Sequence, residues 1–303
     1  MKGRHKPYMG HYFVVHLKPN NYTVRDCNHP DIDICNLETL SSTEYQQDLS
    51  KVIFLRDQNE YEKNRKATEI SKPTILSGLL HDLMIPVPHC FPLDLMHLIF
   101  INIGELLIPL WQGTMKCEAM DSLLSWEWAT LTGDAWQAHG HLVADATPFF
   151  PSFFYRPPRN PAEKISSGYK AIEYFHYLFG LGSGIFRAVL PSKYWKNFCK
   201  LVRGIRIIVN QSIMGSQLQE AHSNLVQFVE EFENLYYQRR VDRLHFCCPC
   251  IHTLLHTAPE VTQVGPGAYY TQFTMERTIG NLRQEIWQPS NLFANLARRA
   301  VMN

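Results

Sequence analysis

The sequence has little surplus charge of either sign. Its 29 lysine and arginine residues nearly balance 28 aspartate and glutamate residues, which leaves a net charge of +1 at pH 7. A chain with this balance has no overall positive field to drive sequence-independent binding to DNA. Any contact with nucleic acid therefore has to come from a local cluster of cations.

Long uncharged hydrophobic runs are also missing. No apolar stretch follows the basic residues 1–6, so we expect no signal peptide. The most apolar run, residues 93–111, contains Asp94, His97 and Glu105, which is typical of a buried helix rather than a membrane span. The eight cysteines have no disulfide-framework spacing, which indicates a reducing compartment. We expect a soluble intracellular protein with no membrane partner.

Common nucleotide-binding and hydrolase motifs are absent as well. The glycines of residues 180–184 follow a predicted helix and lack the G-x-G-x-x-G spacing, so we expect a loop rather than a dinucleotide site. We find no P-loop, no Ser-His-Asp arrangement and no internal repeat. An independent hydrolase therefore has no supporting motif.

Most of the sequence is patterned for helix. Residues 1–84 form an irregular lead-in, exposed and helical over 44–70, and residues 85–303 form a helical region. We predict a mainly α fold with few strands, in which residues 147–161 form a loop, 269–273 a short strand, and Ser192 and Ser216 cap helices. The predicted helices cover residues 93–110, 162–179, 192–209, 216–240, 244–256 and 274–286, with two shorter ones in 122–144.

Asp94 and His97 lie three residues apart on one face of a predicted helix. An acid and an imidazole at this spacing can share a hydrogen bond or a metal ion. The alternative is an aspartate favoured by the helix dipole beside a half-buried histidine, and spacing alone favours that alternative.

Three cysteines gather near three histidines late in the chain. Cys247 and Cys250 have Cys-x-x-Cys spacing, and His252 and His256 lie four residues apart, which invites a zinc interpretation together with Cys248 and His245. No second ligand pair follows at zinc-finger spacing, and we expect Pro249 to break the local helix. We favour a structural role for this cluster.

A short basic strip follows the aromatic loop of residues 149–155. Arg156, Arg159, Lys164 and Lys170 have the composition of a surface that neutralises phosphates beside stacked bases. The alternative is a solvated loop whose arginines pair with acids such as Glu163. The low net charge favours this alternative.

Several longer strings resemble the CACTA-type (En/Spm-like) DNA transposases, in the branch abundant in mushroom-forming fungi. The resemblance extends over nearly the whole chain, from about residue 3 to residue 300, and it matches only the C-terminal part of such a protein. It rests on residues 91–98 with the Asp-x-x-His signature, 110–114, 156–164, 194–202, and the helix of Glu276 with the Gln-Pro-Ser-Asn turn at 288–291.

The resemblance implies an RNase H-like catalytic core interrupted by a helical insertion. This chain then holds the insertion lobe and a C-terminal remnant of the core, with Asp94 and His97 close to Glu276 in space. Glu276 corresponds to the third catalytic carboxylate, a ligand of Mg²⁺ in two-metal phosphoryl transfer. The resemblance also implies transposon-end DNA as a partner, a nuclear location, and self-association or association with a full-length transposase.

Two classes of function compete on this basis. One is a partial cut-and-paste transposase that is inactive alone, because the first two catalytic acids of the family have no counterpart in the sequence. The other is a retained module that binds DNA or a related transposase without catalysis.

Overall fold

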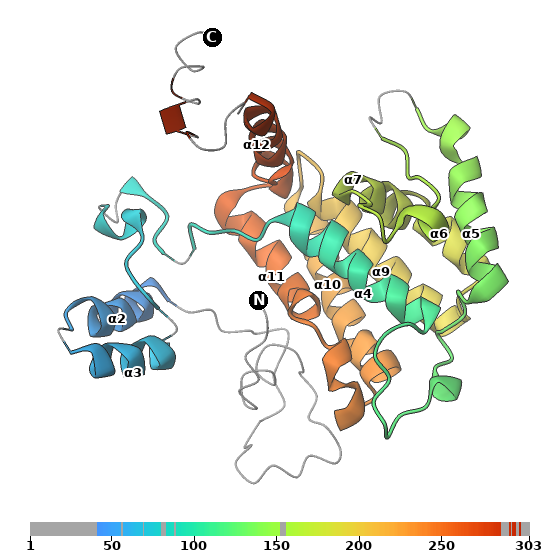
Figure 1. Cartoon of the computed structure of the whole chain (residues 1–303), viewed down its shortest axis with the longest axis horizontal. Helices are drawn as coiled ribbons and strands as arrows, with labels where there is room; N and C mark the ends of the chain where they lie inside the picture. Colours follow the sequence, from blue (N-terminus) through green and yellow to red (C-terminus); the bar gives the residue numbers. More distant parts are fainter. Residues whose placement is uncertain are drawn as a thin grey trace.

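The protein is described here as a computed structural model that covers residues 41–285 except 56, 69, 80–82, 88 and 152–155, together with residues 291, 293–294 and 297. Within these residues the fold is mainly helical and contains no strand, so the mainly α prediction is confirmed (Figure 1). The strand predicted at 269–273 is wrong. That segment instead comprises the end of η10 (Gly267–Tyr269), a turn and the start of α12 (Phe273–Glu285). The described part of the chain therefore contains no sheet remnant of an RNase H-like core.

Two helices of the lead-in pair with each other at one side of the molecule. These are α2 (Ser42–Ile53) and α3 (Gln58–Thr68), rather than the single predicted helix over 44–70 (Figure 1). The interruption between them allows Asp57 Oδ1 to accept the backbone N–H groups that start α3. Their small core consists of Tyr45, Leu49 and Val87, flanked by side chains from η1 (Ile75–Gly78) and its surroundings. This small core therefore reaches past the predicted boundary at residue 84.

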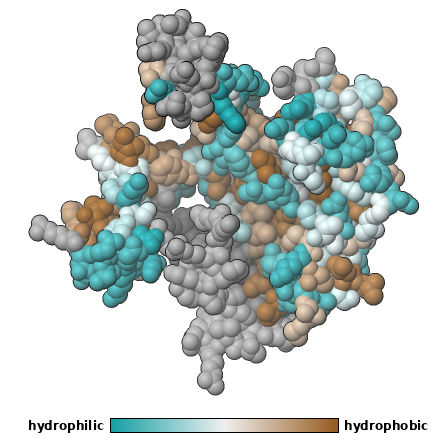
Figure 2. Space-filling model, viewed as in Figure 1, coloured by the Kyte–Doolittle hydropathy of each residue, from teal (hydrophilic) through white to brown (hydrophobic). Residues whose placement is uncertain are grey.

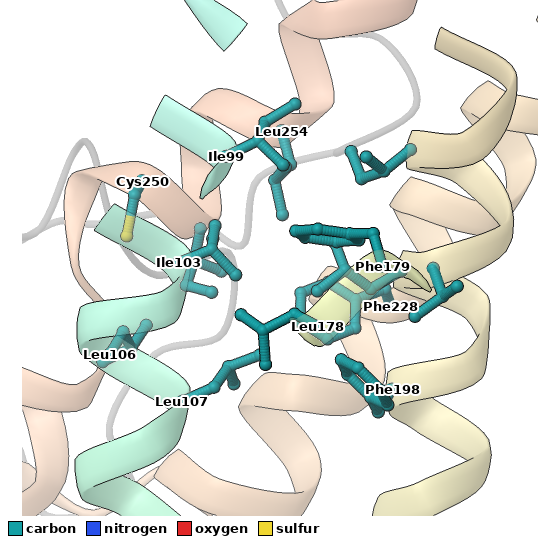
Figure 3. Close-up of a cluster of buried hydrophobic side chains, with 14 of the residues drawn as sticks. Ile99, Ile103, Leu106, Leu107, Leu178, Phe179, Phe198, Phe228, Cys250 and Leu254 are labelled. Atoms are coloured by element: carbon teal, nitrogen blue, oxygen red, sulfur yellow. The ribbon is translucent and has the colours of Figure 1, made fainter. Parts of the chain in front are cut away.

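A continuous buried helix lies at the centre of the main body. It consists of the π-helical η3 (Met96–Asn102) and the regular α4 (Ile103–Gln112), in agreement with the helix predicted over 93–110. Ile99 and Ile103 are completely buried, and they face Phe179, Phe198 and other side chains from four surrounding segments (Figure 3). Burying each such side chain contributes roughly 1.5–3 kcal/mol. This helix is therefore the axis on which the main core is assembled.

Three long helices enclose this axis: α9 (Ser192–Ile208), α10 (Gly215–Phe232) and α11 (Pro249–Val264). The first two were predicted from their apolar stripes, and α11 replaces the helix predicted over 244–256. The start signals differ from expectation. Pro191 rather than Ser192 caps α9. The Gln217 side chain, not the predicted Ser216 box, accepts the Met214 N–H at the start of α10. Pro249 begins α11 instead of breaking a helix, because proline fits the first helical position.

The region between α4 and α9 departs most from prediction. The single helix expected over 162–179 is divided into α6 (Pro161–Lys164), α7 (Ala171–Tyr174) and the π-helical η6 (Phe175–Leu181), with Gly168 at φ +75° in the interruption. The loop expected at 180–184 is helical instead and includes α8 (Gly182–Ile185). Short elements complete this region, namely η4 (Leu123–Ser125), α5 (Gly133–Asp145), η5 (Thr147–Phe149) and η7 (Phe186–Ala188).

Two contacts explain why helix continues through the glycines. A Cβ at Gly182 would lie 2.9 Å from the Phe198 ring, so the absence of a side chain lets α9 approach closely. Arg206 then donates to the carbonyl oxygens of Phe179 and Gly180, at 2.7 and 2.9 Å. These contacts satisfy carbonyl groups that the change of helix type leaves open.

The surface is unevenly polar. Figure 2 shows hydrophilic residues over much of the main body, whereas apolar groups gather over the segment that joins α3 to η3. The exposed large apolar residues of the N-terminal part are Ile53, Phe54, Ile75, Leu79, Leu83, Ile85 and Phe91.

Candidate functional site at the start of helix α12

Asp94 lies just before η3 and is largely buried, with its side chain 11% exposed. Its carboxylate accepts the backbone N–H groups of Met96 and His97, at 3.3 and 3.0 Å. These two bonds satisfy donors at the helix start, which is the usual role of an aspartate at this position.

The same carboxylate also reaches across the fold. Asp94 Oδ1 accepts the Gln272 backbone N–H at 2.9 Å and the Thr271 hydroxyl at 3.3 Å, from residues nearly 180 positions later in the chain. Helix α12 begins at the next residue, and the N–H of Glu276 in its first turn bonds to the Gln272 carbonyl at 2.8 Å. The chain between them forms the helical lobe that leaves Asp94 and returns to it. Asp94 and the helix that carries Glu276 are therefore directly connected.

His97 completes a short side-chain relay with Asp94. Its Nδ1 lies 2.5 Å from Asp94 Oδ2, and 45% of the His97 side chain is exposed. Because an ionised carboxylate only accepts hydrogen bonds, Nδ1 carries the proton in a neutral His97 and the lone pair lies on Nε2. The buried Asp94 carboxylate therefore fixes the orientation of the His97 ring.

The electrostatics keep Asp94 ionised. Burial acts to raise the pKa of Asp94, but the hydrogen bonds from Gln272, His97 and Met96 outweigh burial and hold that pKa below its usual value. Burial next to the negative charges of Glu260 and Asp94 raises the pKa of Tyr270 to about 12.

Glu260 is a member of this region that sequence reasoning missed. Its carboxylate accepts the Leu93 backbone N–H at 2.7 Å, one residue before Asp94, and burial raises its pKa. Glu260 therefore holds α11 to the entrance of η3. Its position near the end of an amphipathic helix carries no sequence signal for a contact with a residue so distant in the chain.

The described residues do not form a two-metal centre. Five donors surround the Asp94 carboxylate, which has about four lone-pair sites, so its oxygens are already committed. Glu276 is exposed, and no group of three or more His, Cys, Asp or Glu side chains in the described part of the chain is arranged to hold a metal ion. Mg²⁺ coordination by Glu276 would need further ligands.

The predicted basic strip is divided between two roles. Arg159 is paired with the fully buried Glu173, through Nε–Oε1 at 2.5 Å and Nη2–Oε2 at 2.9 Å, and it also donates to the Gly168 carbonyl at 3.0 Å. Its acid is therefore Glu173 rather than the expected Glu163. Burial opposes ionisation of Glu173, but the Arg159 hydrogen bonds outweigh it and lower the pKa of Glu173. Arg156 lies 3.9 Å from the same acid, and its side chain is 43% exposed, so it is less closely held than Arg159.

The other two cations of the strip are exposed. The Lys164 side chain lies 3.9 Å from Glu163 and is 47% exposed, and Lys170 is also exposed at the start of α7.

The cysteines and histidines of the possible zinc cluster form pairs rather than one group, because Cys248 interacts with Cys250 and His252 contacts His256, whereas Cys247 and His245 have other neighbours. Cys247 packs against Tyr237, Cys250 directs its sulfur at the Asn102 carbonyl at 3.9 Å, and His245 contacts the Lys116 carbonyl at 2.7 Å. Burial raises the pKa of the Cys247 thiol well above its ordinary value, which opposes formation of the thiolate that zinc needs. The described residues contain no zinc cluster of three or more such ligands.

No helix among the described residues is both long enough and apolar enough to cross a membrane. Comparisons of the chain with protein-family models, with curated proteins and with solved structures found no match.

Proposed function

We propose that this chain is the helical insertion lobe and closing acidic helix of a cut-and-paste DNA transposase of the CACTA type, in its fungal branch. The observation that carries the proposal is the contact between the Asp94 carboxylate and the backbone of Gln272, at 2.9 Å. It joins the Asp-x-x-His segment to the helix of Glu276, as an insertion that leaves and re-enters one catalytic region would require.

In this proposal the three residues have different roles. Asp94 is a positioning residue, because its oxygens orient His97 and fix the start of α12. His97 presents its Nε2 toward the reacting groups. Glu276 would supply one carboxylate to Mg²⁺, and the chemistry such ions would supply in the complete family site is charge stabilisation in a phosphoryl transfer. One carboxylate does not hold a pair of such ions, so the chain alone is inactive.

The surface of α12 supports the need for a further partner. Met275, Ile279 and Leu282 recur at helical spacing on this helix and remain 49%, 49% and 42% exposed. An apolar stripe of this kind is suited to packing against another element. We propose that it packs against the RNase H-like sheet of a transposase, where the two further acids reside. Work on transposon-end DNA would place the protein in the nucleus.

A complementation assay tests this function. The chain is incubated with labelled transposon-end DNA and Mg²⁺ or Mn²⁺, with and without an RNase H-like transposase half that carries the other two acids. We expect nicking only in the mixture, and we expect Glu276→Gln to abolish it. Asp145→Asn, a change at an exposed position at the end of α5, is the matched control and should leave nicking intact. Nicking by the chain alone that disappears with Glu276→Gln would refute the inactive fragment, and no nicking in the mixture would refute the catalytic assignment.

A second candidate function is a module that binds DNA or a related transposase without catalysis. It is favoured by the exposure of Lys164 and Lys170, because exposed cations are available for phosphates. Metal-independent DNA binding without nicking in the mixture would select this function over the first.

A further inference from the structure

Two histidines on α11 face each other across one helical turn. The Nε2 atoms of His252 and His256 are 3.1 Å apart, and their ring centroids are 4.9 Å apart. Both rings are partly buried, on a helix whose inner face packs into the main core. A separation of 3.1 Å requires one ring to donate its N–H to the lone pair of the other, so the accepting ring is neutral.

The same separation suits a chelating pair. Two imidazole nitrogens at about 2.0–2.1 Å from one tetrahedral ion lie about 3.3–3.4 Å apart, close to the separation observed here. The helix already holds both rings on one side, and small rotations of the two rings would direct both lone pairs at a common point. Little ordering of the chain is therefore needed for binding.

We propose that His252 and His256 form a two-histidine site for a divalent transition-metal ion such as Cu²⁺, Ni²⁺ or Zn²⁺, with water as the remaining ligands. Imidazole suits these ions, and the affinities should follow the order Cu²⁺ above Ni²⁺ and Zn²⁺. Among the described residues, these two imidazoles are the protein donors of the site. The ion would brace α11 one turn before Glu260, which holds Leu93 beside Asp94.

The first test is a calorimetric titration of the full chain with Ni²⁺. We expect His252→Gln and His256→Gln each to remove the same binding event, because each supplies one of the two donors. Loss of a ligand should cost at least the roughly tenfold in affinity that loss of an outer hydrogen-bonding partner costs. His245→Gln and Cys250→Ser are matched controls on neighbouring side chains and should leave that event unchanged. Unchanged binding in both histidine variants, or its loss in Cys250→Ser, would overturn the site.

A second test uses the unaltered chain and so does not depend on how the variants fold. Diethyl pyrocarbonate is applied with and without Ni²⁺, and the modified histidines are mapped by peptide mass. We expect Ni²⁺ to protect His252 and His256 while His245 reacts equally in both samples. Equal modification of His252 and His256 with and without Ni²⁺ would contradict the proposal. Neither test depends on DNA or on nuclease activity, so their outcome is separate from that of the proposed function.

Discussion

Arg243 is a buried charged side chain far from the candidate site, with only 1% of its surface exposed. Its guanidinium donates to both oxygens of Asp121, at 2.7 and 2.6 Å, and to Gln238 and Ser125. Burial opposes ionisation of Asp121, but the hydrogen bonds from Arg243 and Trp126 hold its pKa well below the usual range. Both the Arg243 guanidinium and the Asp121 carboxylate are therefore hydrogen-bonded in the core.

We expect Arg243→Ala to destabilise the protein by about 3–5 kcal/mol, because it leaves a buried carboxylate without its partner. The control is Arg203→Ala, which removes an exposed ion pair with Glu220 and should cost about 0–1 kcal/mol. Urea denaturation of both variants measures the difference. Equal losses in the two variants would contradict a special role for burial.

His139 titrates in an unusual range because it is enclosed by rings. It stacks on Trp136 and Phe186 and its Nε2 lies 2.8 Å from the Tyr177 hydroxyl. Burial lowers the pKa of His139 to about 4. Its pKa in the folded state is thus below its unfolded value of about 6.5, so protonation favours the unfolded chain.

We expect the stability that depends on neutral His139 to be complete above pH ~6.5 and to be lost as the pH falls toward ~4, by up to about 3 kcal/mol. His252 and His256 act in the same direction, since their pKa values are also lowered. His139→Gln should therefore reduce, without abolishing, the slope of unfolding free energy against pH. Denaturation of both proteins across this range measures it, and identical slopes would refute the assignment.

Some of these side-chain contacts could be predicted from the sequence and others could not, for a physical reason. Asp94 and His97 are three residues apart, so helical spacing places them on one face and allows their contact. Arg243 and Asp121 are 122 positions apart, and nothing in the local pattern around either residue indicates the other. Contacts within one helix turn can be inferred from sequence. Contacts between residues that are distant in sequence become visible only in the three-dimensional structure.

At the scale of elements, long helices were predictable and their interruptions were not. Helix α9 carries a strong apolar stripe over five turns, so its presence and extent follow from periodicity. The interruption at Gly168 depends on the pairing of Arg159 with Glu173 beside it, a contact that periodicity does not register. Spacing of apolar residues therefore predicted one helix where the chain forms three short segments.

The packing of α9 on α10 depends on a glycine. A Cβ at Gly204 would lie 2.8 Å from two carbons of Leu225 and 3.3 Å from the Ala221 carbonyl oxygen. We expect Gly204→Ala to cost about 1–3 kcal/mol, since overpacking forces the two helices apart. Gly215→Ala, at the start of α10 with open space around it, should be close to neutral. Thermal unfolding compares the two, and a neutral Gly204→Ala would show that Leu225 yields easily.

The start of α12 should depend on Asp94. Replacement by alanine removes the acceptor of the Gln272 N–H, and a hydrogen bond to a charged group contributes about 1.5–3 kcal/mol. We expect Asp94→Ala to speed amide exchange in the first turn of α12 by about ten- to a hundredfold while α9 and α10 remain protected. Asp145→Ala is the matched control. Hydrogen-exchange mass spectrometry measures this, and unchanged exchange around Gln272 would contradict the link.

At the scale of the whole molecule, composition and periodicity predicted the mainly α fold class. They did not predict that the lead-in has a core of its own. The lead-in contains its own small core, built from Tyr45, Leu49 and Val87, which lie on both sides of the predicted boundary. Tyr45 and Leu49 lie one turn apart on α2, and the segment that follows α3 brings Val87 against them. The sheet remnant was expected from resemblance, and the described residues supply no strand for it.

The proposed contact with DNA concerns the whole molecule, because a net charge of +1 means that any such binding depends on a few local cations. Arg159 is committed to the buried Glu173, whereas Arg156, Lys164 and Lys170 have exposed side chains. If these three contact phosphates, the logarithm of affinity should fall with the logarithm of salt with a slope of about −2 to −3. Lys164→Ala and Lys170→Ala should each reduce that slope by about 1 and weaken binding to all sequences alike, because phosphate contacts carry little base information.

Arg159→Ala should behave differently from the lysine variants. It leaves Glu173 buried without its main partner, so it should lower thermal stability, whereas the lysine variants should leave stability unchanged. Titration of labelled duplex and single-stranded DNA at two salt concentrations, together with thermal unfolding of each variant, separates the two effects. Equal binding by wild type and both lysine variants would show that this strip does not contact DNA, and a destabilised Arg159→Ala would then assign its arginine to the fold alone.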